Sequence, residues 1–258
     1  MPLDSNPDRP PRPWYLAAAL VVVLLSAVVG ASFVGWSYWR QQPDYTNTYL
    51  TNRGAQLDVA LPDTTRMTLD ASTRAEVSLY GSRRVVRLST GQVVFEVPQD
   101  GRPFEVQAGP WRIETAGARF AVRYTPKVDK DTRGQVAVVD GRVQVRLGAA
   151  SMELGSGAQV EGHAAGRLGP VSQVAPDAIA AWRWGRVSFD ATPLVEVLAE
   201  FERYAATGLV PADPQVGALP VTGTFDPRRP EDLRRMLPEL LPVRLQVRGQ
   251  RTEIIDVR

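Results

Sequence analysis

The stretch LSTGQVVFEVPQDGRPFEV, residues 88–106, decides the fold class of the largest part of this 258-residue chain. Every second residue of QVVFEV from Val93 onward is apolar, and the same spacing returns in the PFEV that follows the turn residues Asp100-Gly101. Because successive side chains of a β-strand point to opposite faces of a sheet, the two runs predict a strand pair with one apolar face. The predicted core residues are Val93, Phe95, Val97, Phe104 and Val106.

The same period of two continues from about residue 49 to residue 160, and no segment in this range has helical spacing. Glycine-containing turns such as Asp100-Gly101 and Asp140-Gly141 separate the apolar runs. Short strands at even spacing predict an all-β domain over residues 49–165, with a linker over 166–181. A sandwich, a barrel and a coiled stack all fit this pattern, and we expect stacked or solenoid-like strands.

The character of the sequence changes after Ala178. A strand is predicted at 186–189, and Thr192 then supplies an N-cap with Pro193 at the first helical position. Apolar residues recur at helical spacing from 194 to 205, and Gly208 is expected to end this helix. Trp182 and Trp184 flank the change, and we expect them to pack between two domains rather than to stack on a ligand.

A second helix is predicted from Pro230, where Glu231 and Asp232 place negative charge in the first turn and complement the helix dipole. Pro238 is expected to kink this helix or to end it early. Short strands are predicted at 209–210, 220–225, 244–247 and 252–257. Residues 182–258 therefore form a small α+β domain in a chain that is mainly β.

An apolar stretch near the N-terminus predicts a membrane anchor. No charged side chain lies between Arg12 and Arg40, and residues 16–36 are about 21 residues, enough to cross a bilayer core of about 30 Å. Aromatic residues at both ends suit the two interfaces, so we expect a cytoplasmic tail at 1–13, a single transmembrane helix at 14–39 and a linker at 40–48. A cleaved secretory signal is the alternative. Either interpretation places the rest of the chain outside the bacterial inner membrane, in the periplasm.

The composition argues against an enzyme. The chain has no cysteine, which excludes thiolate chemistry, and it has one histidine. Its formal charge of +2 is too small to indicate nucleic-acid binding. His163 is expected in a solvated loop. Asp58, Asp63 and Asp70 could be considered as a general acid and base, but turn formation explains Asp63 and Asp70 better. Nucleophile-elbow and phosphate-loop spacings are absent from the sequence. We therefore predict no catalytic residue, no cofactor and no metal site.

Four arginines cluster on or beside the second predicted helix. They are Arg228, Arg229, Arg234 and Arg235. A solvated face explains them most simply, and an acidic partner surface is the sharper interpretation. The sequence assigns no partner-binding residues.

Six landmarks resemble the FecR family of transmembrane regulators. They occur in the family's order and cover nearly all of the chain beyond residue 50. The landmarks are LPDTTRMTLDASTRAEV (61–77), RRVVRLSTGQVVFEV (83–97), DGRPFEVQA (100–108), ETAGARFAVR (114–123), VAVVDGRVQVR (136–146) and AWRWGRVSFDATPLVEVLAEFERYA (181–205). Thr64, Gln92 and Ala118 depart from residues that the family commonly has.

The resemblance implies an anti-sigma type of signal transduction protein in the inner membrane. Its periplasmic part would be a FecR domain followed by a unit similar to the secretin and TonB short N-terminal domain. That part would bind the signalling domain of a TonB-dependent outer-membrane receptor and control an extracytoplasmic-function sigma factor, in the regulation of iron uptake. Residues 1–13 are expected to lack most of the cytoplasmic region that binds the sigma factor in this family. The alternative is a structural or protein-binding module of the envelope without sigma-factor control.

Overall fold

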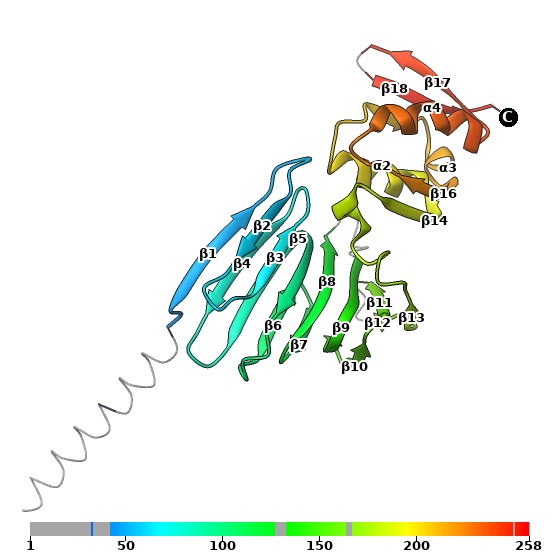
Figure 1. Cartoon of the computed structure of the whole chain (residues 1–258). Coiled ribbons are helices and arrows are strands. Elements are labelled where there is room, and N and C mark those ends of the chain that lie inside the picture. The colour runs from blue at the N-terminus through cyan, green and yellow to red at the C-terminus, as the bar shows by residue number, and fades with distance from the viewer. Residues whose placement is uncertain (1–31, 33–41, 127–132, 164–166, 250, 258) are drawn as a thin grey trace, which may run out of the picture. The chain divides into compact units, whose positions relative to one another are not determined.

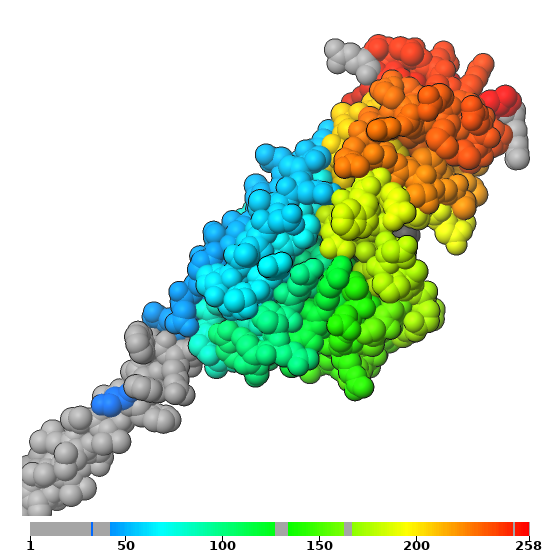
Figure 2. All heavy atoms as spheres, in the orientation of Figure 1, coloured from blue at the N-terminus to red at the C-terminus, as the bar shows by residue number. Residues whose placement is uncertain are grey.

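The computed structural model describes residue 32 and residues 42–126, 133–163, 167–249 and 251–257. The predicted tail and transmembrane helix lie outside these residues, apart from Ser32. No helix of the described ranges is long and apolar enough to cross a membrane. Tyr45–Arg258 belong to one compact unit, which carries a β domain followed by a smaller C-terminal unit of helices and strands (Figure 1 and Figure 2).

The β domain has two sheets that share its two longest strands, β5 (Arg84–Val97) and β9 (Arg133–Leu147). One sheet runs β1-β4-β5-β6-β7-β9-β10, and the other runs β2-β3-β5-β8-β9-β11, with the short strands β12 and β13 beside β11. The remaining bounds are β1 (Tyr45–Leu50), β2 (Leu57–Ala60), β3 (Arg66–Leu69), β4 (Arg74–Leu79), β6 (Phe104–Ala108), β7 (Trp111–Thr115), β8 (Ala118–Thr125), β10 (Ala150–Gly155), β11 (Ala158–His163), β12 (Arg167–Leu168) and β13 (Ser172–Gln173).

Two glycines mark the places where the long strands pass from one sheet to the other. Gly91 has φ +105 and Gly141 has φ +89, values that side chains of other residues rarely permit. A Cβ at Gly91 would also lie 2.2 Å from Thr73 Oγ1. The turn predicted at Asp140-Gly141 is therefore wrong: Gly141 bends β9 without ending it.

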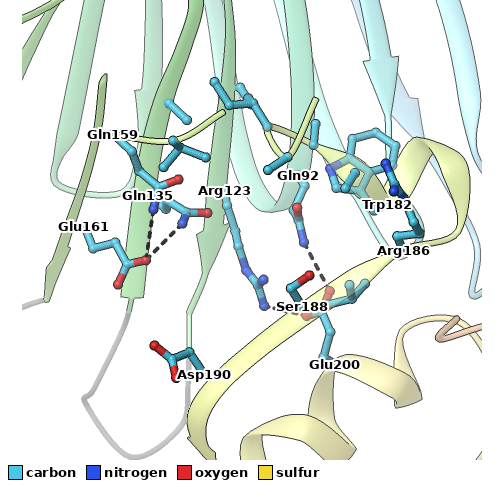
Figure 3. Close-up of a pocket in the computed structure, with 18 of the residues that line it drawn as sticks. Gln92, Arg123, Gln135, Gln159, Glu161, Trp182, Arg186, Ser188, Asp190 and Glu200 are labelled. Carbon is cyan, nitrogen blue, oxygen red and sulfur yellow. Dashed lines mark hydrogen bonds and ion pairs between the residues drawn. The ribbon is translucent and has the colours of Figure 1, made fainter. Parts of the chain in front are cut away.

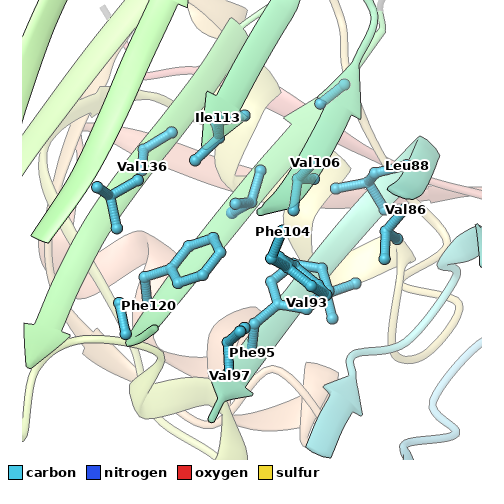
Figure 4. Close-up of a cluster of buried hydrophobic side chains, with 14 of the residues drawn as sticks. Val86, Leu88, Val93, Phe95, Val97, Phe104, Val106, Ile113, Phe120 and Val136 are labelled. Carbon is cyan, nitrogen blue, oxygen red and sulfur yellow. The ribbon is translucent and has the colours of Figure 1, made fainter. Parts of the chain in front are cut away.

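The two runs of residues 88–106 face each other across the core instead of pairing with each other. Residues 93–97 of β5 lie in one sheet, whereas β6 lies in the other sheet and pairs in parallel with residues 84–87 of β5. The rings of Phe95 and Phe104 meet edge to face at 5.5 Å between centroids (Figure 4). All five predicted core residues are buried, so the predicted apolar face is confirmed and only the strand pairing was wrong.

The strand arrangement also differs from the stacked or solenoid-like order that we expected. Among the described strands of the β domain, β5 and β6 form the one parallel pair, and all other neighbouring pairs are antiparallel. Solenoid coils place successive strands in parallel, whereas this domain folds as a sandwich of two sheets joined by long bent strands. An all-β domain over this region is confirmed.

The C-terminal unit begins with a short 3₁₀ helix, η1 (Ala181–Trp184). β14 (Val187–Pro193) pairs with β16 (Pro220–Phe225), and β18 (Arg251–Asp256) lies between β15 (Leu209–Pro211) and β17 (Val243–Arg248). The helices are α2 (Leu194–Glu202), α3 (Pro214–Gly217) and α4 (Pro230–Leu240). The apolar faces of α2 and α4 pack on these strands around Leu198, Phe201 and Leu237.

Helix bounds differ from the prediction in two places. α2 begins at Leu194 with Pro193 as its N-cap residue, and it ends at Glu202 rather than at Gly208. The turn after Glu202 turns the backbone toward the β domain, which the helical spacing of the apolar residues did not indicate. α4 begins at Pro230 as predicted and continues through Pro238 to Leu240. Among the strands, 220–225 is predicted to the residue.

Candidate functional site

The end of α2 and the turn after it dock on the β domain through charged and polar side chains. We call the group Gln92, Arg123, Asp70, Glu200, Arg203 and Tyr204 the junction cluster. Asp70 is completely buried. Its Oδ2 accepts hydrogen bonds from Tyr204 Oη at 2.6 Å and from Arg203 Nη2 at 3.0 Å, so the turn before β4 is tied to the residues after α2.

Glu200 forms the second half of the junction cluster. Its carboxylate accepts from Arg203 Nη1 at 2.9 Å. It also accepts from Gln92 Nε2 at 3.2 Å and from Arg123 Nη2 (Figure 3). Gln92 lies on β5 and Arg123 on β8, so Glu200 reaches two neighbouring strands of one sheet. Arg203 bridges both carboxylates and also donates to the Ala71 carbonyl at 2.7 Å.

The junction cluster balances two carboxylates with two guanidinium groups. Burial works to raise the pKa of Glu200, but Arg123 and Arg203 outweigh it and hold that pKa below its usual value. Burial raises the pKa of Asp70, because Arg203 and Tyr204 offset the loss of water only in part. Burial and the neighbouring Asp70 also raise the pKa of Tyr204. Removing one charged partner would leave another charge buried without compensation, which is strongly destabilising.

A backbone contact closes the junction on the other side of Arg203. The Gly54 N–H donates to the Arg203 carbonyl at 3.0 Å, and Ser72 Oγ donates to the same carbonyl at 3.2 Å. Gly54 has φ +71, and a Cβ there would lie 2.6 Å from the Tyr204 carbonyl oxygen. Only glycine fits this approach of the loop after β1 to the turn after α2.

The two predicted interdomain tryptophans have different environments. Trp182 is 5% exposed and packs with Ala71, Val94 and Tyr204, and its carbonyl accepts from Gln56 Nε2 at 3.2 Å. Trp184 is 64% exposed. The interdomain prediction is confirmed for Trp182 and wrong for Trp184, because the short 3₁₀ helix turns neighbouring side chains to different sides.

A cavity of about 620 Å³ adjoins the junction cluster, between the sheet of β8, β9 and β11 and the strand β14. Its walls combine polar and apolar side chains, and Figure 3 labels several of the polar ones. Glu161 Oε1 accepts from Gln135 Nε2 at 2.9 Å and from Gln159 Nε2 at 3.4 Å on one side. Ser188, Asp190 and Glu200 contribute to the other side.

The three aspartates singled out in the sequence, Asp58, Asp63 and Asp70, have different roles in the structure. Asp63 accepts from the Thr65 N–H at 3.2 Å, so its turn role is confirmed. Asp58 accepts from Thr68 Oγ1 at 2.7 Å at the surface. The turn interpretation of Asp70 is incomplete, because its carboxylate accepts from the Ala71 backbone in its own turn and also bonds to Arg203 and Tyr204 across the junction. No local pattern indicates these bonds across the junction, because the partners lie more than 130 residues away.

The backbone of His163 lies in β11, paired with Arg133 and Arg167, so the predicted loop is wrong for this residue. The described ranges hold no group of three or more metal-ligating side chains.

Sequence reasoning also missed Arg84, a completely buried arginine at the start of β5. It lies 3.4 Å from Asp63 and 3.2 Å from Asp100, and its Nη2 donates to the Arg102 carbonyl at 2.7 Å. Arg84 therefore joins the turns before β3 and β6. This role is structural.

The arginine cluster is paired with acidic residues of its own segment. Arg234 lies 3.3 Å from Glu231, Arg235 lies 2.7 Å from Asp232, and Arg228 and Arg229 share Asp226. This local pairing supports a solvated face.

Comparison with known proteins identifies a family for the β domain. Residues 47–144, from β1 into β9, match the family model described as FecR protein. These residues therefore form a FecR domain. The predicted family resemblance is thereby confirmed, and the junction cluster joins the FecR domain to the unit that follows it. No curated protein sequence matches the chain.

Two crystal structures of a candidate anti-sigma factor from Parabacteroides distasonis resemble this chain. The first has a TM-score of 0.72 at 22% identity and covers 82% of this chain and 99% of that chain. The second has a TM-score of 0.71 at 24% identity, with coverage of 81% and 99%. At this identity the likeness shows a shared fold, which includes both the FecR domain and the C-terminal unit.

Proposed function

We propose that this chain is a sigma-factor regulator of the anti-sigma type. The FecR match over residues 47–144 carries this proposal. The shared fold supports it, because the likeness to the candidate anti-sigma factor extends over 99% of that chain. The function we propose is protein binding and signal transduction, and we assign no catalytic reaction.

The proposed setting is the bacterial inner membrane. Residues 14–39 would form a single span with the N-terminus in the cytoplasm, because they hold no charged side chain and have aromatic residues at both ends. The FecR domain and the C-terminal unit would then lie in the periplasm. There they would bind the signalling domain of a TonB-dependent receptor and control an extracytoplasmic-function sigma factor for iron uptake.

The junction cluster offers a physical route for such a signal. A partner can shift a conformational equilibrium only as far as its affinity differs between the two states. The FecR domain and the C-terminal unit are held together by buried charges that are stable only when paired. A receptor domain that binds the docked and undocked arrangements with different affinity would therefore change the exposure of the α2 end.

Binding to receptor signalling domains tests this proposal. The full-length chain in detergent is titrated with the isolated signalling domain of each TonB-dependent receptor of the same organism, at low and at moderate salt. We expect saturable binding to one of them. Arg203→Met, which breaks the junction cluster, should change the affinity, whereas the exposed control Arg229→Met should not. Binding to none of the domains at either salt concentration would contradict the proposal.

A further inference from the structure

β1 is the outermost strand of its sheet, and within the described residues it pairs with β4 alone. The Thr51 N–H donates to the Thr73 carbonyl at 2.9 Å, which continues the register of β1 with β4. Because hydrogen-bonding direction alternates along a strand, the odd-numbered residues bond to β4 and the even-numbered residues face outward. Thr46, Thr48 and Leu50 therefore direct their backbone N–H and C=O groups away from the sheet.

This edge lacks the usual protection. Proteins shield edge strands with charged side chains, proline, bulges or very short length. β1 reads YTNTYL over six residues, without charge, proline or glycine. The other described strands that pair on one side only each carry at least one such feature: Asp58 in β2, Glu153 in β10, two-residue length in β12 and β13, a bulge in β14, Pro211 in β15, Pro220 in β16, and Arg244 and Arg248 in β17.

We propose that the outer edge of β1 pairs antiparallel with β1 of a second copy of this chain, with Thr48 on the two-fold axis. Outward-facing residues must lie opposite outward-facing residues in an antiparallel pair. A two-fold axis at Thr48 places Thr48 opposite Thr48 and Thr46 opposite Leu50. All three outward-facing residues of each copy then exchange backbone hydrogen bonds with the other copy.

The side chains fit a partner of identical sequence. Pairing places only neutral groups opposite one another, and threonine pairs across strands are favourable. Leu50, which is 63% exposed, gains cover beside Thr46 of the second copy. β17 is less suited to self-pairing, because two arginines from each copy would gather at the contact.

Asn47 regulates access to this edge. Its Oδ1 accepts from the outward-facing Thr48 N–H at 2.9 Å and so occupies the donor that the second copy would use. Pairing requires this short-range bond to be exchanged for a bond between strands, which keeps the association reversible.

Single-cysteine cross-linking tests the register directly, because the chain has no cysteine of its own. The full-length chain is purified in detergent as Thr48→Cys, Thr46→Cys and Leu50→Cys and is treated with a mild oxidant. Residues opposite each other in a hydrogen-bonded pair have Cα atoms about 5.5 Å apart, within disulfide range. The two Thr46 positions would be about 14 Å apart along the strand, at about 3.4 Å per residue.

We expect Thr48→Cys to form covalent dimers at least tenfold faster than Thr46→Cys or Leu50→Cys, although all three side chains are exposed on one face. A mixture of Thr46→Cys and Leu50→Cys chains should cross-link with each other. Adding Thr48→Lys to that pair should abolish the product, because two like charges would then face each other. Equal rates for the three single variants, or no cross-linked dimer from any of them, would overturn the proposal, whatever the chain binds as a regulator.

Discussion

Tyr204 Oη donates a 2.6 Å hydrogen bond to Asp70 Oδ2 although 134 residues separate the two in sequence. Both side chains are buried, and Arg203 bonds to the same carboxylate oxygen. The contact fixes the end of α2 on the turn between β3 and β4. It thereby couples the C-terminal unit to the FecR domain. The buried carboxylate and its partners have lost their water, so separating them would leave polar groups buried without hydrogen bonds.

Removing Arg203 should destabilise the chain more than removing any surface arginine. Arg203→Met leaves Asp70 and Glu200 without their shared cation, and breaking a buried pair in this way costs about 3–5 kcal/mol. The exposed pair of Arg229 with Asp226 at 3.8 Å provides the control, because Arg229→Met should cost less than about 1 kcal/mol. Urea unfolding of both variants measures the difference. Equal midpoints would show that the junction cluster does not contribute to stability.

Gly54→Ala should loosen the junction through its backbone. The substitution strains a residue at φ +71 and pushes the new Cβ against the Tyr204 carbonyl. Gly101→Ala is a matched control, since Gly101 has φ +81 and open space around the Cβ position, so strain alone costs about 1–2 kcal/mol there. Hydrogen exchange should become at least tenfold faster in residues 51–56 and 200–205 of Gly54→Ala only. The same exchange in both variants would reject the proposed close approach.

The loss caused by Glu200→Gln should depend on pH. Since the pKa of Glu200 is held below its usual 4.5, the folded chain binds the proton less tightly than the unfolded chain does. The stabilising contribution is complete above that usual value and disappears as the pH falls through the lower folded-state pKa. The difference in unfolding free energy between wild type and Glu200→Gln should therefore be largest near neutral pH and shrink in acid.

The loss of stability caused by Asp70→Asn should depend on pH in the opposite direction to the loss caused by Glu200→Gln. Burial raises the pKa of Asp70 above its usual 3.8, so the folded chain binds this proton more tightly than the unfolded chain does. Protonation of Asp70 therefore adds to the free energy of unfolding at low pH, and this contribution weakens as the pH rises. The loss caused by Asp70→Asn should become smaller toward neutral pH. Parallel pH profiles for the two variants would contradict the opposite pKa directions.

Leu198→Asp should unfold the C-terminal unit. Leu198 is 5% exposed on the apolar face of α2, and burying an unpaired carboxylate there should cost about 4 kcal/mol. Val195 on the same helix is 52% exposed, so Val195→Asp should leave the thermal midpoint nearly unchanged. Thermal melting of both variants distinguishes the two faces. A midpoint for Leu198→Asp equal to that of wild type would reject the helix orientation.

Local pattern was sufficient to predict the core and most elements of this chain. Alternation identified Phe95 and Phe104 as core residues, and Pro230 with its acidic neighbours marked the start of α4. Such signals lie within a few residues of the feature that they predict. They did not reveal that Gly141 bends a continuous strand, because a glycine between two apolar runs is equally typical of a turn.

The junction cluster could not be predicted from the same kind of pattern. Asp70 stands in a sequence typical of a turn, and Arg203 follows a helix in a manner typical of a solvated C-terminus. Their pairing depends on how two separately predicted units dock. Neither periodicity nor spacing encodes that docking, so Asp70 was interpreted as a turn residue and Arg203 received no role.

Transcription from a sigma-dependent promoter tests the proposed regulation most directly. The promoter of an extracytoplasmic-function sigma factor that depends on this chain is fused to a reporter in a strain lacking the chain and in strains complemented with wild type or Arg203→Met. The account predicts that loss of the chain changes reporter output several-fold, that wild type restores it, and that Arg203→Met does not. Identical output in all strains, for every such sigma factor of the organism, would contradict it.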